Sequence, residues 1–332
     1  MLKFDKVYYE PQAMDYELGG QLRRRYNDLP WIEIESHNNI KELRENPNTE
    51  FARMKQHLII GVRKTHKYVP NHKSSDFLVP YTSSGCSAMC LYCYLVCNYN
   101  KCSYLRVFVN REQMMDKLLK TAHQADKPLT FEIGSNSDLV LENRVTQNLP
   151  WTIETFAKGE RGNLTFPTKF ADIDDLLGLE HKGRTLVRMS VNPQEIIRTV
   201  ELGTAPLDQR IDAVNKLCDA GYRIGLLIAP IVLTDGWKEQ YTRLIAQLAE
   251  GLSERVKQAM QIEIIFMTYS YIHRVINTEA FPHAPDLYDT NRMTGRGKGR
   301  YTYHQTAREE AAALLQSEIE RLFGQGKIMY IV

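Results

Sequence analysis

The chain has 332 residues, of which 43% are hydrophobic and 25% are charged, and its formal net charge is +2. This ordinary globular composition argues against a disordered chain and suits one large or two modest cores. No segment approaches the ~18 consecutive apolar residues of a membrane helix, and the first residues lack the pattern of a signal peptide. We therefore expect a cytoplasmic protein with no membrane partner, in which any nucleic-acid surface is a local concentration of Lys and Arg.

The order of patterns along the chain predicts three segments. Residues 1–75 are rich in charge, and we expect a partly helical N-terminal extension that packs on the rest. In residues 76–272, strand-like apolar runs alternate with amphipathic stretches of helical spacing. The strand-like runs are FLVPYT, YLRVFVN, LTFEIG, NLTFPTK, TLVRMSVN, YRIGLLIAPIV and QIEIIFMTY. The helical stretches are REQMMDKLLKTAHQ, QRIDAVNKLCDA and WKEQYTRLIAQLAEGL.

This alternation predicts an α/β fold, a partial (β/α)6-type barrel with a parallel sheet and outer helices. In such a barrel the reactive groups lie where the strands end. The alternation stops after about Tyr271, and residues 273–332 form the third predicted segment. There the basic, glycine-rich stretch TNRMTGRGKGRYTYH precedes a closing helix with the sequence REEAAALLQSEIERLF.

A cysteine-rich loop follows the first strand-like run. Five of the six cysteines, at positions 86, 90, 93, 97 and 102, fall within seventeen residues, which indicates metal ligation rather than disulfides. Cys86, Cys90 and Cys93 form C-x3-C-x2-C, and three thiolates leave one iron of a 4Fe-4S cubane open to a small molecule. A zinc site completed by Cys97 or Cys102 is the alternative metal site. Buried free thiols are the non-functional interpretation.

Polar side chains follow several of the later runs. Ser137 and Asp138 follow LTFEIG, Lys169 follows NLTFPT, and Ser190 lies within TLVRMSVN. Hydroxyl and ammonium groups at one end of a barrel suit a cofactor that carries a carboxylate. Each residue taken singly is equally compatible with a solvated loop position or a cap at a strand end.

The sequence around the cysteines and several later segments resemble a known family. YTSSGCSAMCLYCYL, FEIGSNSDLV, FPTKF, VRMSVNP and GYRIGLLIAPI resemble spore photoproduct lyases, a family of the radical S-adenosylmethionine (SAM) superfamily, from about residue 5 to the C-terminus. The resemblance implies a 4Fe-4S cluster and reductive cleavage of SAM to a 5′-deoxyadenosyl radical. It further implies repair of the thymine dimer 5-thyminyl-5,6-dihydrothymine in spore DNA, an electron donor such as flavodoxin or ferredoxin, and a location in the spore core.

The resemblance also implies residue roles. Carried over by position, Ser137, Lys169 and Ser190 contact SAM, and Asp138 belongs to the same cofactor-binding group. Tyr92 and Tyr94 match tyrosines that help to return the hydrogen atom to SAM. The alternative for these two rings is that they pack around the cluster and shield it from solvent.

One position departs from the family. Ser135 stands where the family has the cysteine that donates a hydrogen atom to the product thymine radical. An O–H bond is much stronger than an S–H bond, so serine cannot take over this role. We expect Cys97 to be the replacement donor and Cys102 to be a buried small residue. The departure leaves open a radical SAM reaction on another nucleic-acid substrate.

The basic stretch is the candidate DNA contact. The resemblance places a hairpin here that enters DNA at the lesion, with Arg296, Arg300 and Tyr301 as DNA-binding residues. Guanidinium groups suit phosphates and an aromatic ring suits an unstacked base, and a lesion inside a duplex has to be turned out of the stack. The alternatives are a solvated loop and, for the whole chain, a non-catalytic nucleic-acid-binding protein stabilised by a metal.

Overall fold

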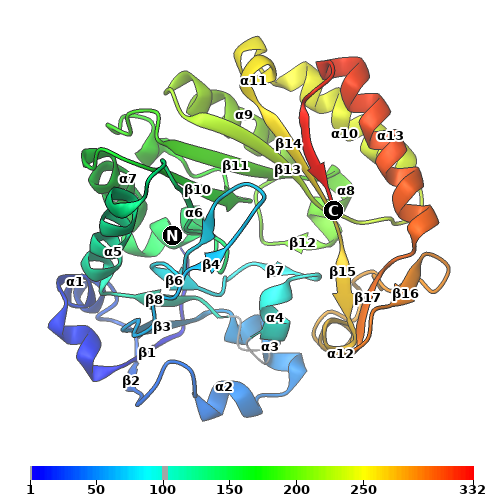
Figure 1. Cartoon of the computed structure of the whole chain (residues 1–332). Helices are drawn as coiled ribbons and strands as arrows, with labels where there is room; N and C mark the ends of the chain where they lie inside the picture. The colour runs from blue at the N-terminus through cyan, green and yellow to red at the C-terminus, as the bar shows by residue number, and fades with distance from the viewer. Residues whose placement is uncertain (1, 99–103) are drawn as a thin grey trace. The chain divides into compact units, whose positions relative to one another are not determined.

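The computed structural model describes residues 2–98 and 104–332, and it forms two compact units (Figure 1). The first unit comprises Met1–Ser87, Asn98–Thr168 and Asp172–Leu186, and the second comprises Ala88–Cys97, Lys169–Ala171 and Val187–Val332. This division by compactness does not test the three segments expected from the sequence pattern, which stay a prediction.

The first unit contains a five-stranded sheet built largely from the N-terminal residues. Its strand order is β2 (Trp31–Glu33), β1 (Lys6–Tyr9), β3 (His57–Gly61), β8 (Arg106–Phe108) and β6 (Ser83–Ser84). The first four strands are parallel, and β6 is antiparallel to β8. The N-terminal segment is partly helical, as expected, and it also contributes β1, β2 and β3 to this sheet, which the sequence pattern did not predict. The central strand of this sheet, β3, is only five residues long, so its sequence shows no clear hydrophobic period. Every residue of β3 is nevertheless buried.

The same unit contributes a second group of strands. These are β10 (Asn163–Thr168), β9 (Thr130–Glu132) and β5 (Phe77–Leu78), which are parallel, and β4 (Val69–Pro70), which is antiparallel to β5. The helices of this unit are α1 (Glu17–Arg25), α2 (Lys41–Glu45), α3 (Phe51–Met54), α5 (Arg111–Gln124), α6 (Leu139–Thr146) and α7 (Asn148–Lys158). Short 3-10 turns occur at Pro11–Asp15, Asn48–Glu50 and Asp174–Leu176. The helix predicted over residues 111–124 is confirmed as α5.

The second unit carries the remaining parallel strands. Strand β11 (Thr185–Val191) begins in the first unit and continues in the second, where the strand order is β11, β13 (Arg223–Ile231), β14 (Gln261–Phe266) and β18 (Ile328–Ile331). The helices are α8 (Gln194–Thr199), α9 (Leu207–Asp219), α10 (Trp237–Gly251), α11 (Glu254–Ala259), α12 (Tyr271–Ala280) and α13 (Gln305–Phe323). The amphipathic stretches predicted as helices are confirmed as α9, α10 and α13, and α10 packs beside α13 (Figure 1).

Two small sheets complete the second unit. One pairs β7 (Met89–Cys90) with β12 (Glu201–Leu202), and α4 (Tyr94–Asn98) starts just after it. The other has the order β15 (Thr268–Ser270), β17 (Arg300–Tyr303), β16 (Met293–Gly295), all antiparallel. The predicted basic hairpin is therefore present as β16 and β17. No helix among the described residues is long and apolar enough to span a membrane.

Candidate functional site

The cysteine loop of the second unit is held by backbone pairing. Cys90 lies opposite Glu201 in the β7–β12 pair. The amide of Cys93 donates to the carbonyl of Cys90 at 3.1 Å, which closes a tight turn between the two thiols. Neither cysteine forms a disulfide and both are partly exposed, as is Cys86 in the first unit. Accessible thiols in a fixed turn are suited to metal ligation.

Side chains of helix α12 form hydrogen bonds to the backbone of the same loop. His273 Nε2 lies 2.8 Å from the carbonyl oxygen of Cys93, and Asn277 Nδ2 donates to the carbonyl of Leu91 at 2.7 Å. A carbonyl only accepts hydrogen bonds, so His273 carries its hydrogen on Nε2, and Nδ1 faces the Ser270 hydroxyl at 3.2 Å. Burial lowers the pKa of His273, which favours the neutral ring. The loop is thereby tied to the helix that follows β15.

In the first unit, the turn before Cys86 lies against the turn after β9. The amide of Gly85 donates to the carbonyl of Asn136 at 2.8 Å, and Gly85 forms a parallel bridge with Ser137. Gly85 has φ 77°, a conformation that glycine adopts without strain. The structure therefore brings Ser137 next to the residue that precedes Cys86, a predicted cluster ligand.

A buried carboxylate orients Ser137. Glu142 of α6 is 1% exposed and accepts hydrogen bonds from Ser83 and from Thr82, the latter at 3.0 Å. Burial raises the pKa of Glu142, and these hydrogen bonds offset part of that rise. The hydroxyls of Ser83 and Ser137 form a hydrogen bond of 2.8 Å, which connects Ser137 to the buried carboxyl group through Ser83.

Asp138 has a defined local role. Its side chain caps α6 by accepting from the amides of Val140 at 3.1 Å and Leu141 at 3.2 Å. The hydroxyl of Thr168 donates to the same carboxylate at 2.9 and 3.1 Å. Such a cap stabilises the start of a helix. The proposed role of Asp138 in cofactor binding stays a prediction beside this capping role.

Lys169 and Ser190 lie together in the second unit. The Lys169 ammonium donates to the Ser190 hydroxyl, to Glu201 Oε1 at 3.0 Å and to the carbonyl of Ala229 at 2.8 Å. Ser190 in turn donates to the same Ala229 carbonyl at 2.9 Å. An ammonium has three hydrogens, and these three acceptors account for them in the conformation described. A ligand carboxylate that binds Lys169 has to replace one of them.

Glu201 is the centre of this cluster. Its side chain is fully buried and accepts from Lys169, from Arg210 Nη2 at 2.8 Å, from Asn192 Nδ2 at 2.8 Å and from the Tyr92 hydroxyl. Burial alone raises the pKa of the Glu201 carboxyl, but the two cations and the hydrogen bonds outweigh it and lower the pKa to about 2. Glu201 is therefore ionised at neutral pH.

The two tyrosines of the cysteine loop differ in their surroundings. Tyr92 is 9% exposed, and burial together with the charge of Glu201 raises its pKa well above the ordinary value. Tyr94 is 54% exposed, at the start of α4. The structure thus gives Tyr92 a buried partner for its hydroxyl and leaves the ring of Tyr94 open to solvent.

The candidate hydrogen donors are only partly described. Ser135 lies in the turn after β9 and is partly exposed. Cys97 belongs to α4, but its side chain is outside the described residues, as is the whole of Cys102. The predicted role of Cys97 as donor therefore stays a prediction.

The basic hairpin exposes its tip. Arg296 and Arg300 are exposed, and the Arg296 amide donates to the carbonyl of Arg300 at 2.8 Å. The ring of Tyr301 lies 4.5 Å from that of Tyr288. Arg292 instead pairs with Asp235 and Asp289, each at 3.1 Å. Of the basic residues in this segment, Arg292 is therefore the least available to phosphate.

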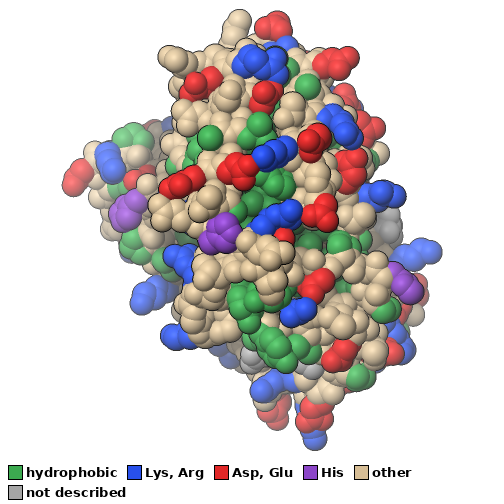
Figure 2. Space-filling view, turned by 90° about the vertical axis from the view of Figure 1, so that its right-hand side faces the viewer, with side chains coloured by type: hydrophobic (Ala, Val, Ile, Leu, Met, Phe, Trp, Pro, Cys, Tyr) green, Lys and Arg blue, Asp and Glu red, His purple; other side chains and the backbone are tan. Residues whose placement is uncertain are grey.

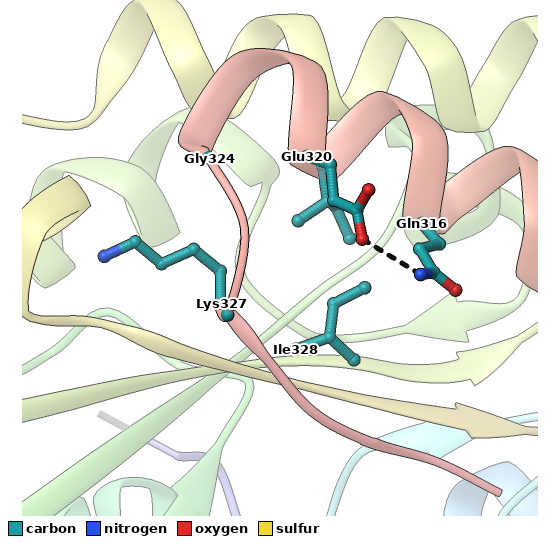
Figure 3. A pocket seen from close by; sticks show the side chains of 7 residues that line it. Gln316, Glu320, Gly324, Lys327 and Ile328 are labelled. Atoms are coloured by element: carbon teal, nitrogen blue, oxygen red, sulfur yellow. Dashed lines mark hydrogen bonds between the residues drawn. The ribbon is translucent and has the colours of Figure 1, made fainter.

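On the face shown in Figure 2, Lys and Arg side chains are interspersed with Asp and Glu. A pocket of about 210 Å³ lies between the end of α13 and β18 (Figure 3). At its edge Gln316 donates to Glu320, one turn further along α13, at 2.9 Å. None of the predicted site residues lines this pocket, so it is not part of the candidate site.

Sequence reasoning missed the residues that organise the site, namely Ser83, Glu142, Asn192, Glu201, Arg210 and His273. One of them had a signal in the sequence. Arg210 lies three and four residues before Ala213 and Val214, on the apolar face of α9, and it is fully buried. A charged residue at a core position is rarely buried without a partner. The others carry no such mark, because their partners are distant in sequence.

Comparisons with known proteins show the family of this chain. The family model for spore photoproduct lyase matches residues 2–332. The chain belongs to the spore photoproduct lyase family. The spore photoproduct lyase of Bacillus subtilis strain 168 is 33% identical over 98% of this chain and 97% of its own length. A solved spore photoproduct lyase variant with bound AdoMet and dinucleoside spore photoproduct is 28% identical and has a TM-score of 0.91, with 99% of each chain covered.

Family membership confirms the fold class, the enzyme class and the cofactors. The fold is that of a radical SAM enzyme. A solved radical SAM methyltransferase from Kitasatospora setae with cobalamin and a 4Fe-4S cluster bound is 12% identical, covers 76% of this chain and 53% of its own, and has a TM-score of 0.51. The donor set fits a 4Fe-4S cluster, because Cys86, Cys90 and Cys93 are partly exposed cysteines outside any disulfide. The alternatives of a zinc site and of a non-catalytic protein are not supported.

Proposed function

We propose that this chain repairs DNA by splitting the spore photoproduct, 5-thyminyl-5,6-dihydrothymine, into two thymines. The observation that supports this most is the match over the whole chain to relatives that include a lyase solved with AdoMet and dinucleoside spore photoproduct. When bound, the cluster and SAM supply the 5′-deoxyadenosyl radical that abstracts hydrogen from the substrate. The residues of this chain then have to bind, orient and shield the reactants.

The cofactor-binding roles proposed from the sequence have physical support. Cys86, Cys90 and Cys93 hold the cluster, and Ser137, Lys169 and Ser190 contact SAM. Lys169 is held in place by an ionised, buried carboxylate, and a fixed cation binds a carboxylate with less loss of side-chain entropy.

We assign different tasks to the two tyrosines. Tyr94 is the exposed ring and is the better placed to exchange a hydrogen atom with a bound reactant. Tyr92 donates its hydroxyl hydrogen to Glu201. This hydrogen is therefore not directed towards a ligand. Tyr92 therefore serves chiefly to order the loop between Cys90 and Cys93, and Tyr94 carries the hydrogen return.

The DNA is bound, in this proposal, by the hairpin of β16 and β17. Arg296 and Arg300 contact phosphates, and Tyr301 contacts a base at the opened lesion. Thymine dimers are joined covalently and stack poorly, which reduces the free energy needed to turn them out of the duplex. The reducing electron comes from a small electron carrier such as flavodoxin or ferredoxin. Because the relatives are from spore formers, we place the protein in the cytoplasm and, in spores, in the core.

The test is an anaerobic assay on the reconstituted, reduced protein. SAM and an oligonucleotide that carries spore photoproduct are added, and 5′-deoxyadenosine and restored thymine are quantified. Restored thymine with little net loss of SAM is the expected result. Deoxyadenosine without restored thymine contradicts the proposed substrate.

Ser135 favours one second candidate, a radical SAM reaction on a different nucleic-acid lesion. It predicts that deoxyadenosine formation is stimulated by some other damaged DNA or RNA more than by spore photoproduct. The same assay, run with a panel of irradiated oligonucleotides, distinguishes the two candidates.

A further inference from the structure

A buried lysine lies against the first cluster ligand. Lys55 is the C-cap residue of α3 and is 3% exposed. Its ammonium donates to the carbonyl oxygen of Cys86 at 2.7 Å, and it lies 5.3 Å from the centroid of the Phe51 ring. Both Lys55 and Cys86 belong to the first unit. No role considered so far involves this lysine.

The charge of Lys55 matters for a cluster on Cys86. The carbonyl oxygen and the thiol sulfur of one residue are four bonds apart, which limits how far the ammonium can lie from the ligand sulfur. A cubane held by three thiolates has a net negative charge, and reduction adds one more electron to it. Among the factors that set the potential of such clusters are net charge, hydrogen bonds and solvent exposure.

The burial of Lys55 strengthens its effect. Between solvent-exposed groups, water and salt screen most of a charge–charge interaction. Between buried groups the effective dielectric constant is lower, so the interaction is several times stronger. A positive charge at this place stabilises the reduced cluster more than the oxidised cluster, because the reduced form is the more negative one.

We propose that Lys55 is a positioning residue for the cluster, which holds the Cys86 carbonyl and raises the reduction potential of the bound cluster. Such a residue favours reduction, which SAM cleavage requires. The position of the ammonium depends on α3, whose Phe51 and Met54 side chains are buried. The N-terminal segment thereby contributes to the cofactor as well as to the fold.

The experiment measures the midpoint potential of the reconstituted full-length protein by redox titration followed by electron paramagnetic resonance. Lys55→Gln keeps a hydrogen-bond donor and removes the charge, Lys55→Met removes both, and Lys55→Arg keeps both. The matched control is Lys6→Met in β1 of the same unit, where the ammonium pairs with Glu42 at 3.0 Å.

The expected result is a lower potential in Lys55→Gln and Lys55→Met. At a fixed applied potential the ratio of reduced to oxidised cluster falls about tenfold. For a one-electron couple this corresponds to a midpoint potential that is lower by about 59 mV. Lys55→Arg and Lys6→Met keep the potential of the parent protein. Iron and sulfide content is measured in each sample, so that a difference in cluster loading is not read as a difference in potential.

Two outcomes overturn the proposal. One is an unchanged potential in fully loaded Lys55→Gln. The other is failure of Lys55→Arg to take up a cluster while circular dichroism shows it folded, because its charge is retained. If Lys55→Met and Lys55→Gln are folded but take up no cluster while Lys55→Arg is fully loaded, the need for the charge is supported.

Discussion

Tyr92 donates its hydroxyl hydrogen to the buried carboxylate of Glu201, 109 residues away in sequence. Glu201 also accepts from two cations, and its own backbone pairs with that of Cys90. One side chain thus connects the cysteine loop, the predicted SAM-binding lysine and a buried arginine. The second unit's part of the candidate site depends on this carboxylate.

Replacing Glu201 by alanine is expected to lower the free energy of unfolding by about 3–5 kcal/mol, because Lys169 and Arg210 lose a buried counter-charge. Urea unfolding followed by circular dichroism measures the change. Glu195→Ala is the control: Glu195 is about half exposed and pairs with Arg243 at 3.1 Å, and exposed pairs contribute about 0–1 kcal/mol. Equal losses in the two variants contradict the role given to Glu201.

The two tyrosines give a second prediction. Tyr92→Phe removes a buried donor to a carboxylate and is expected to lower the free energy of unfolding by roughly 1–3 kcal/mol. Tyr94→Phe is expected to change stability by less than about 0.5 kcal/mol but to raise the amount of 5′-deoxyadenosine released per thymine restored. Both quantities are measured for both variants. The assignment is wrong if Tyr94→Phe leaves the product ratio unchanged.

Ser135 leads to a third prediction. Ser135→Cys restores a thiol where the family has one, and an S–H bond gives up its hydrogen atom more readily than an O–H bond. We expect a larger fraction of the product radicals to end as thymine and fewer side products, measured by chromatography of the digested oligonucleotide. Cys97→Ala in the parent protein is expected to have the opposite effect. Unchanged products in Cys97→Ala exclude that thiol as the donor.

The hairpin gives a fourth prediction. Arg296→Ala and Arg300→Ala are each expected to weaken DNA binding and to reduce the slope of log affinity against log salt by about one, since each loses one phosphate contact. Fluorescence anisotropy at several salt concentrations measures the slope. Arg321→Ala on α13, where the guanidinium pairs with Glu318, is the control and should leave the slope unchanged. Unchanged slopes in both hairpin variants would exclude phosphate contacts at the tip.

Glu10 gives a prediction for acid stability. Burial raises its pKa, but hydrogen bonds from the side chain of His37 and from the amides of Val62 and His37 outweigh this and lower the pKa from 4.5 to about 2. The folded protein then binds fewer protons than the unfolded chain, so this stabilisation is full above about pH 4.5 and is lost as the pH falls towards 2.

Glu10→Gln does not titrate, so its stability should change less between pH 5 and pH 3 than that of the parent protein. We expect a difference on the order of 2 kcal/mol, at about 1.4 kcal/mol for each pKa unit. The parent protein and the variant are both prepared without the cluster and unfolded with acid. Circular dichroism then measures the difference in stability. Parallel unfolding curves contradict the prediction.

Much of the fold could be predicted because local patterns carry it. Helices α5, α9, α10 and α13 have apolar residues at three- and four-residue spacing, and strand β13 is an apolar run after Arg223. The N-terminal sheet was missed because β1 and β2 are four and three residues long, too short to show a period. Helices α6 and α7 were missed as well, since buried polar residues such as Glu142, Asn143 and Asn148 interrupt their apolar pattern.

The sequence by itself determined the family and the strand-helix order and predicted the three cluster ligands, because these depend on residue identity and short spacing. Only the tertiary structure decided that Glu201 joins Tyr92 to Lys169 and Arg210, and that Lys55 lies against Cys86. These relationships join residues between 9 and 109 positions apart. Contacts at such separations depend on how strands and helices pack, and a buried charge can be recognised as stabilising only when its partners are known.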